Sequence, residues 1–172
     1  ARATGLNIIM GSSYYVEENY PPGCHVDTKT EDEIVDEIVR DIFEGVEETG
    51  IRAGLIGEVG CSWPLTVDER KVLRASGRAQ QLTGAPLMIH PGRNSRAPFE
   101  IVDVLRQVDT DLGRTIMCHI DRTIDRTSPS SNWPRPNVSL STIYSGSNTR
   151  TFRGRFRWIC PTMVGDCAGW NG

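Results

Sequence analysis

The sequence predicts an α/β fold in which helices cover a parallel β-sheet. Four short apolar runs are separated by three segments whose apolar residues recur at helical spacing. The runs do not alternate between apolar and polar residues, which is typical of strands buried on both faces in a parallel sheet. Strands and helices are therefore expected to follow one another along the chain.

The first strand is predicted in the apolar run LNIIMG, residues 6–11. Thr30 and Glu33 then have the spacing of a capping box, in which two side chains satisfy free backbone N–H groups at a helix start. Apolar residues recur at intervals of three and four from there to Val46. This pattern predicts the first helix.

The second strand is predicted in AGLIGEVG, residues 53–60. Thr66 and Glu69 form another capping box. The helix that follows is expected over residues 68–82, because Gly84 stands where a left-handed residue would end it.

The last two strands are predicted in PLMIHP, residues 86–91, and RTIMCHID, residues 114–121. Between them, Pro98 suits the first turn of a helix that continues to Val108. The whole order fits both a closed barrel and an open doubly wound sheet. The dinucleotide-binding form of the open sheet is disfavoured, because the sequence contains no GxGxxG.

Three potential metal ligands, Glu58, His90 and His119, stand near the carboxyl ends of consecutive predicted strands. Barrel enzymes build their active sites at that edge of the sheet. One carboxylate and two imidazoles suit zinc or a similar ion, which would acidify a bound water molecule. A single strand-end histidine is more often structural or solvated, so the equivalence of the three positions carries this prediction. His25, in a loop, is expected to be solvated.

Four other residues near these positions have weaker predicted roles. Arg93 and Arg96 lie in the polar loop GRNSR, where they would either bind an anionic substrate group or be solvated. Asp121 would either orient a metal ligand or cap the next element. Cys61 is interpreted as a core thiol.

The composition argues against several kinds of partner. A net charge of −3 gives no reason to expect nucleic acid, and no run of about 18 apolar residues could span a membrane. The given sequence does not open with basic residues followed by an apolar run, so no secretion signal is expected. The number of cysteines, five, is odd, and no two of them form a CxxC motif, so a disulfide framework is not expected. This favours a reducing compartment and hence the cytoplasm.

The strand-end segments also resemble a known family. The strings GEVGCSWPLT, ERKVLRA, IHPGRNSRAPFEI and HIDRTI follow the order and spacing of phosphotriesterase-related proteins. The resemblance covers most of residues 4–125 and implies part of a (β/α)₈ TIM barrel, about the third to the sixth strand. It also implies a metal-dependent hydrolase of the amidohydrolase superfamily. The substrate would be an ester, a lactone, a phosphotriester or a small N-acyl amide.

The same resemblance implies two divalent metal ions, with zinc expected, and a metal-bridging hydroxide as nucleophile. Glu58 would be the carboxylate that bridges both ions, and His90 and His119 would be ligands from the fifth and sixth strands. The family also uses an HxH pair on its first strand and an aspartate on its eighth, and this sequence contains neither. A catalytically inactive barrel fragment is therefore the first alternative.

The chain changes character after residue 125. Residues 1–125 hold 21 acidic and 13 basic residues, whereas residues 126–172 hold one aspartate and six arginines. We expect a partial hydrolase barrel in the first part and an irregular tail in the second.

A reading-frame slip is the favoured explanation of this tail. Suitable codons for residues 131–170, read one base earlier, can encode LELA and YDLFG strings that resemble the family's next helix and strand. The alternative is that the segment RTFRGRFRW binds single-stranded nucleic acid through charge and stacking.

Overall fold

The computed structural model describes residues 3–120, which form one parallel sheet with three helices. The strands lie in the order β1-β2-β3-β4, and each is paired in parallel with its neighbour. The predicted α/β fold with a parallel sheet is therefore confirmed. The strands are β1 (Gly11–Ser12), β2 (Leu55–Gly60), β3 (Leu87–His90) and β4 (Thr115–Met117).

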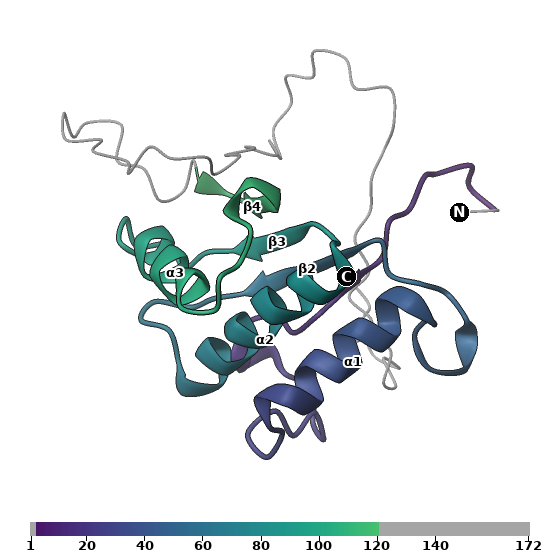
Figure 1. The fold of residues 1–172 in the computed structure, drawn as a ribbon, viewed down its shortest axis with the longest axis horizontal. Coiled ribbons are helices and arrows are strands. Elements are labelled where there is room, and N and C mark those ends of the chain that lie inside the picture. The colour runs from purple at the N-terminus through teal and green to yellow at the C-terminus, as the bar shows by residue number, and fades with distance from the viewer. Residues whose placement is uncertain (1–2, 121–172) are drawn as a thin grey trace, which may run out of the picture.

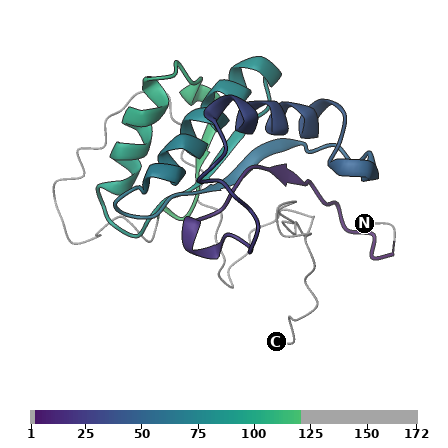
Figure 2. The same ribbon diagram turned by 90° about the horizontal axis from the view of Figure 1, so that it is seen from below.

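Helices connect the strands in chain order, and all three lie on the same face of the sheet (Figures 1 and 2). They are α1 (Glu31–Phe43), α2 (Val67–Thr83) and α3 (Ala97–Arg106). Short 3₁₀ turns supplement them at Glu17–Asn19, Glu47–Thr49 and Leu112–Arg114. The opposite face of the sheet carries no α-helix among residues 3–120 (Figure 2).

The predicted signals at the helix ends are present. Thr30 and Thr66 accept hydrogen bonds from the backbone N–H groups of Glu33 and Glu69, and both capping boxes are complete. Gly84 ends α2 in the left-handed conformation, with φ at 68°. Pro98 stands in the first turn of α3, as predicted. Local chemistry therefore marks four of the six helix ends.

The main core lies between the helices and the sheet. Each of its largest members is almost inaccessible to solvent, and each such side chain contributes roughly 1.5–3 kcal/mol by leaving water. These residues include Ile34 and Ile38 of α1, Leu73 of α2, Leu105 of α3, and Ile56 and Ile89 of the sheet.

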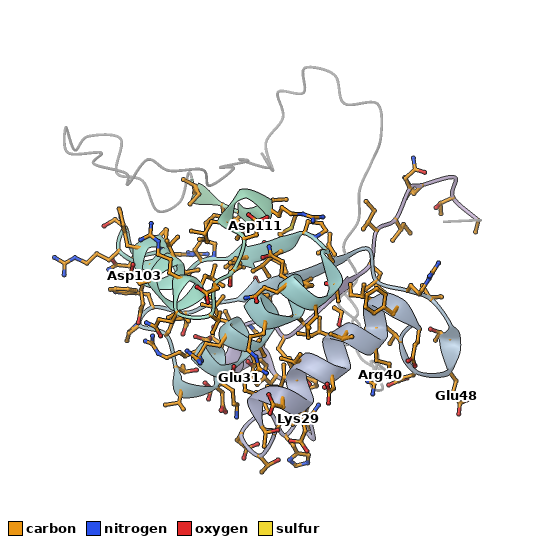
Figure 3. All side chains as sticks on the ribbon, in the orientation of Figure 1. Lys29, Glu31, Arg40, Glu48, Asp103 and Asp111 are labelled. Carbon is orange, nitrogen blue, oxygen red and sulfur yellow. The ribbon has the colours of Figure 1, made fainter. Side chains whose placement is uncertain are left out.

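An ion-pair network joins α1 to α2 outside this core. Arg74 and Arg78 of α2 both contact Glu31, at 2.9 and 3.0 Å. Figure 3 shows Glu31 at the start of α1, beside α2.

The first strand and several element ends differ from the sequence prediction. Residues 6–10 are not paired as a strand. Ile9 is 45% exposed, because β1 is the edge of the described sheet and no strand among residues 3–120 covers its outer side. The first helix ends at Phe43 rather than Val46, and α3 ends at Arg106 rather than Val108. The last strand, β4, ends at Met117 rather than at residue 121. An apolar run thus predicted the neighbourhood of a strand without fixing its pairing.

Several predictions fall on residues outside those described. They concern Asp121, the boundary at residue 125 and the tail, residues 126–172. Within residues 3–120, no helix is both long and apolar enough to cross a membrane.

Candidate metal centre

The structure brings the three predicted ligands together at the carboxyl end of the sheet. Glu58 lies in β2, His90 ends β3 and His119 follows β4 by two residues. Glu58 Oε1 is 3.4 Å from His90 Nδ1 and 3.3 Å from His119 Nε2. One ligand atom from each residue lies within 4.8 Å of the others.

A break in strand regularity turns Glu58 toward this cluster. Residues three apart in a regular strand point to opposite faces, yet Ile56 and Val59 both belong to the helix-side core. The pairing of β2 with β3 is irregular between these two residues, so the alternation reverses there. Glu58 consequently faces away from the helices.

Gly57 makes this irregularity sterically feasible. Its φ is 125°, which side-chain-bearing residues rarely adopt, and a Cβ there would lie 2.2 Å from the carbonyl oxygen of Met88. The glycine before Glu58 therefore permits both the turn of the backbone and the close approach of β3.

The backbone also turns at His119. Cys118 packs with Leu55 and Met88 in a small cluster apart from the helix-side core, so regular alternation would direct the next side chain to the helices. His119 instead has a φ of 52°, a left-handed conformation in which histidine is enriched among residues other than glycine. Its ring lies 4.7 Å from that of His90, centroid to centroid.

Tyr15, which sequence reasoning missed, completes the surroundings of His90. Its hydroxyl lies 3.3 Å from both ring nitrogens of His90, and the two rings meet edge to face at 5.0 Å. Tyr15 follows β1 at the carboxyl edge that holds the other three residues. Its position after the first strand was the available signal.

The charges of the cluster are mutually stabilising. Burial acts to raise the pKa of Glu58, but the hydrogen bond and positive potential of His90, a Cys118 thiol hydrogen bond and His119 outweigh it and lower that pKa. Burial and the Glu58 carboxylate together raise the pKa of Cys118 to about 12. Glu58 is thus held as a carboxylate and Cys118 as a thiol.

These donors fit a divalent metal ion. Tetrahedral zinc with bonds of about 2.0–2.1 Å has neighbouring ligand atoms about 3.4 Å apart, close to the two distances between Glu58 and the histidines. The three side chains are 19–23% exposed, which leaves room for a further ligand from solvent or substrate. Within residues 3–120, this is the one cluster of three such donors.

A pocket of about 590 Å³ adjoins the centre on the His90 side. Its walls come from the loops that follow β1, β2 and β3. They include Tyr15, Ser62, Trp63, His90, Arg93 and Asn94.

The remaining predicted residues separate into two groups. Arg93 lines this pocket, whereas Arg96 is exposed and does not. His25 is exposed and Cys61 is fully buried, which confirms the solvated loop histidine and the core thiol.

Glu69 has a larger role than its capping box predicted. It is 1% exposed, and its carboxylate accepts hydrogen bonds from Glu17 N–H at 3.1 Å and Ser62 N–H at 2.9 Å. The Ser62 hydroxyl also donates to it, at 2.5 Å. One buried side chain therefore ties together the loops after β1 and β2, which both line the pocket.

Comparison with known proteins decides the family. The model of the "Phosphotriesterase family" matches residues 1–129, which is most of the chain. The chain belongs to the phosphotriesterase family. This confirms the resemblance inferred from the strand-end segments.

Curated members of the phosphotriesterase family align over the same region. An "N-acetyltaurine hydrolase" of Homo sapiens is 44% identical over 124 residues, 72% of this chain and 35% of that protein. A "Phosphotriesterase-related protein" of Nematostella vectensis is 49% identical over 122 residues, 71% of this chain and 34% of that protein. The chain thus spans about a third of the length of these relatives.

Solved structures agree with this assignment. A phosphotriesterase homology protein from Escherichia coli, complexed with phosphate in its active site, is 32% identical with a TM-score of 0.62 and covers 69% of this chain and 40% of its own. A resiniferatoxin-binding protein from Rhodobacter sphaeroides is 37% identical with a TM-score of 0.66, and the match covers 70% of this chain and 33% of that one. The four-stranded sheet therefore corresponds to part of a phosphotriesterase-like TIM barrel.

Proposed function

We propose that this chain forms part of a metal-dependent hydrolase in which Glu58, His90 and His119 bind a divalent ion, with zinc as the expected metal. The observation that carries the proposal is the convergence of one carboxylate and two imidazoles within 4.8 Å beside an open pocket. Such a set suits zinc in a catalytic site, where three protein ligands leave a position free. A second ion, as expected from the family resemblance, would need ligands beyond these three residues.

The proposed substrate is an N-acyl amide, and N-acetyltaurine is the specific candidate. Several curated relatives, 42–49% identical, carry the name N-acetyltaurine hydrolase. A divalent ion at this centre would acidify a water molecule and polarise the amide carbonyl. Because the chain spans about a third of those relatives, this activity is proposed for the whole protein.

The residues of this chain have distinct parts in the proposal. Glu58 and the two histidines supply the ligand atoms, and the negative charge of Glu58 offsets part of the charge of the ion. Tyr15 holds the ring of His90 in place through its hydroxyl and its edge contact. His90 also forms part of the pocket wall, so a bound amide would lie next to the centre.

The test measures metal content and hydrolysis separately. The full chain is purified with zinc, bound metal is measured by mass spectrometry, and taurine release from N-acetyltaurine is followed before and after chelation. His90→Ala should lower metal affinity by more than about tenfold, because even loss of a ligand's outer hydrogen-bond partner costs 10–100-fold. His25→Ala, which alters an exposed loop histidine, should leave both measurements unchanged.

The two measurements distinguish the alternatives. A folded chain that binds no zinc contradicts the metal centre. Zinc binding that depends on His90 without hydrolysis of any N-acyl amide, ester or phosphotriester supports the alternative of an inactive barrel fragment.

A further inference from the structure

We propose that Arg93 binds the anionic end of the substrate, and that the site is therefore selective for N-acyl amides whose amine portion carries a sulfonate or carboxylate. This inference rests on the proposed hydrolase function and adds a specificity-determining residue to it. The residue lies in the loop between β3 and α3 and lines the same pocket as His90.

The two sites are close enough for one small molecule. Arg93 follows His90 by three residues, and three residues span at most about 11 Å between Cα atoms. A substrate amide at the metal centre can therefore reach Arg93 with a charged group only a few bonds away. The pocket volume of about 590 Å³ is ample for a ligand of that size.

The charge of Arg93 is available for a ligand. The guanidinium is exposed, and no acidic side chain among residues 3–120 forms an ion pair with it, although Glu18 is also part of the pocket lining. Its planar array of N–H groups matches the paired oxygens of a sulfonate or carboxylate. Such a contact favours anionic over neutral substrates.

Asn94 supplies a second donor beside Arg93. Its Oδ1 atom accepts the backbone N–H of Arg96 at 2.9 Å, which orients the amide and leaves its NH₂ group to donate to an anion. Arg96 itself lies outside the pocket lining. The two arginines of one loop thus differ in position, and Arg96 serves as a matched control.

Gly92 brings the Arg93 loop against the loop that follows β2. A Cβ at Gly92 would lie 2.8 Å from the backbone nitrogen of Trp63, so a larger residue would separate the two loops. Trp63 lines the pocket on the opposite loop. This close approach fixes the position of Arg93 at the pocket wall.

The experiment compares the parent full chain with Arg93→Ala and Arg96→Ala. N-acetyltaurine and the neutral analogue N-acetylethanolamine are titrated by calorimetry, and zinc content is measured on the same samples. We expect Arg93→Ala to weaken N-acetyltaurine binding about tenfold or more, the typical effect of losing a charge-assisted hydrogen bond. Binding of the neutral analogue, zinc content and the behaviour of Arg96→Ala should not change.

The outcomes separate this inference from the hydrolase proposal. An equal loss for both ligands, or no loss for N-acetyltaurine, overturns the role of Arg93 while a zinc-loaded, active parent keeps the proposed function. Selective loss with Arg93→Ala supports the inference even if the parent holds no zinc, and in that case the hydrolase proposal fails instead. An equal effect of Arg96→Ala also overturns it.

Discussion

At the scale of single residues, Asp41 is a buried carboxylate on the helix face that meets β1. It is 6% exposed, and the Ser12 hydroxyl donates a hydrogen bond to it at 2.7 Å. Burial raises its pKa, although the Ser12 hydrogen bond and nearby Arg40 act in the opposite direction. The native chain therefore holds the Asp41 proton to a higher pH than the unfolded chain does.

Replacing this carboxyl should change the pH dependence of stability. Between the usual pKa of 3.8 and the raised native value, the native state binds more protons than the unfolded state, so the free energy of unfolding falls as pH rises. Asp41→Asn removes this pH dependence. The free energy of unfolding of the variant minus that of the parent should therefore rise with pH across this window and then level off. Urea unfolding from pH 3 to pH 7 measures it, with the exposed Asp103→Asn as control. A pH-independent difference would contradict the prediction.

The three ligand residues could be predicted from the sequence, but the directions of their side chains could not. Glu58, His90 and His119 could be chosen from the sequence because parallel strands end at one edge, and position along the chain was sufficient. The directions of these side chains could not be predicted. The direction of Glu58 depends on the irregular pairing of β2, and that of His119 depends on a left-handed backbone conformation. Strand periodicity alone would direct His119 to the helices.

At the scale of elements, the two capping boxes look equivalent in sequence and differ in the fold. Glu33 is exposed at the start of α1, whereas Glu69 is buried at the start of α2 and accepts hydrogen bonds from two loops. The motif predicted both helix starts correctly. The extra contacts of Glu69 join segments 52 and 7 residues away, which local spacing does not reveal.

Truncating these glutamates should therefore have unequal effects. Glu69→Ala leaves the part-buried N–H groups of Glu17 and Ser62 without their acceptor. A fully buried unsatisfied donor costs about 1–3 kcal/mol, so we expect these two donors together to lower the unfolding free energy by roughly 2 kcal/mol. Glu33→Ala removes the equivalent residue of the exposed capping box and should cost much less. Chemical denaturation of both variants provides the comparison, and similar losses would show that the buried contacts contribute little.

At the scale of the whole molecule, the described chain is a layer of helices on one face of a parallel sheet (Figure 2). This layering was predictable, because unbroken apolar strands alternating with amphipathic helices leave few other arrangements. The choice between barrel and open sheet was not fixed by periodicity and came from family resemblance. We propose that β1 to β4 correspond to the third to sixth strands of the family barrel.

The change of composition after residue 125 leads to a prediction about the gene. If the tail arose from a reading-frame slip, the transcript across the codons for residues 114–172 should encode LELA and YDLFG strings when read one base earlier. Sequencing that transcript and its downstream region tests this directly. Tail codons that do not yield those strings would reject the slip, and salt-sensitive RNA binding lost on tail removal would favour the nucleic-acid alternative.

The shared acceptor at Glu69 has a consequence for the energetics of ligand binding. The loops after β1 and β2 cannot separate without releasing the same carboxylate, so ordering one loop reduces the conformational entropy left to the other. A ligand that contacts both walls therefore meets the entropic cost once. The binding free energy of such a ligand should therefore be more favourable than the sum of the binding free energies of two separate fragments, one for each wall.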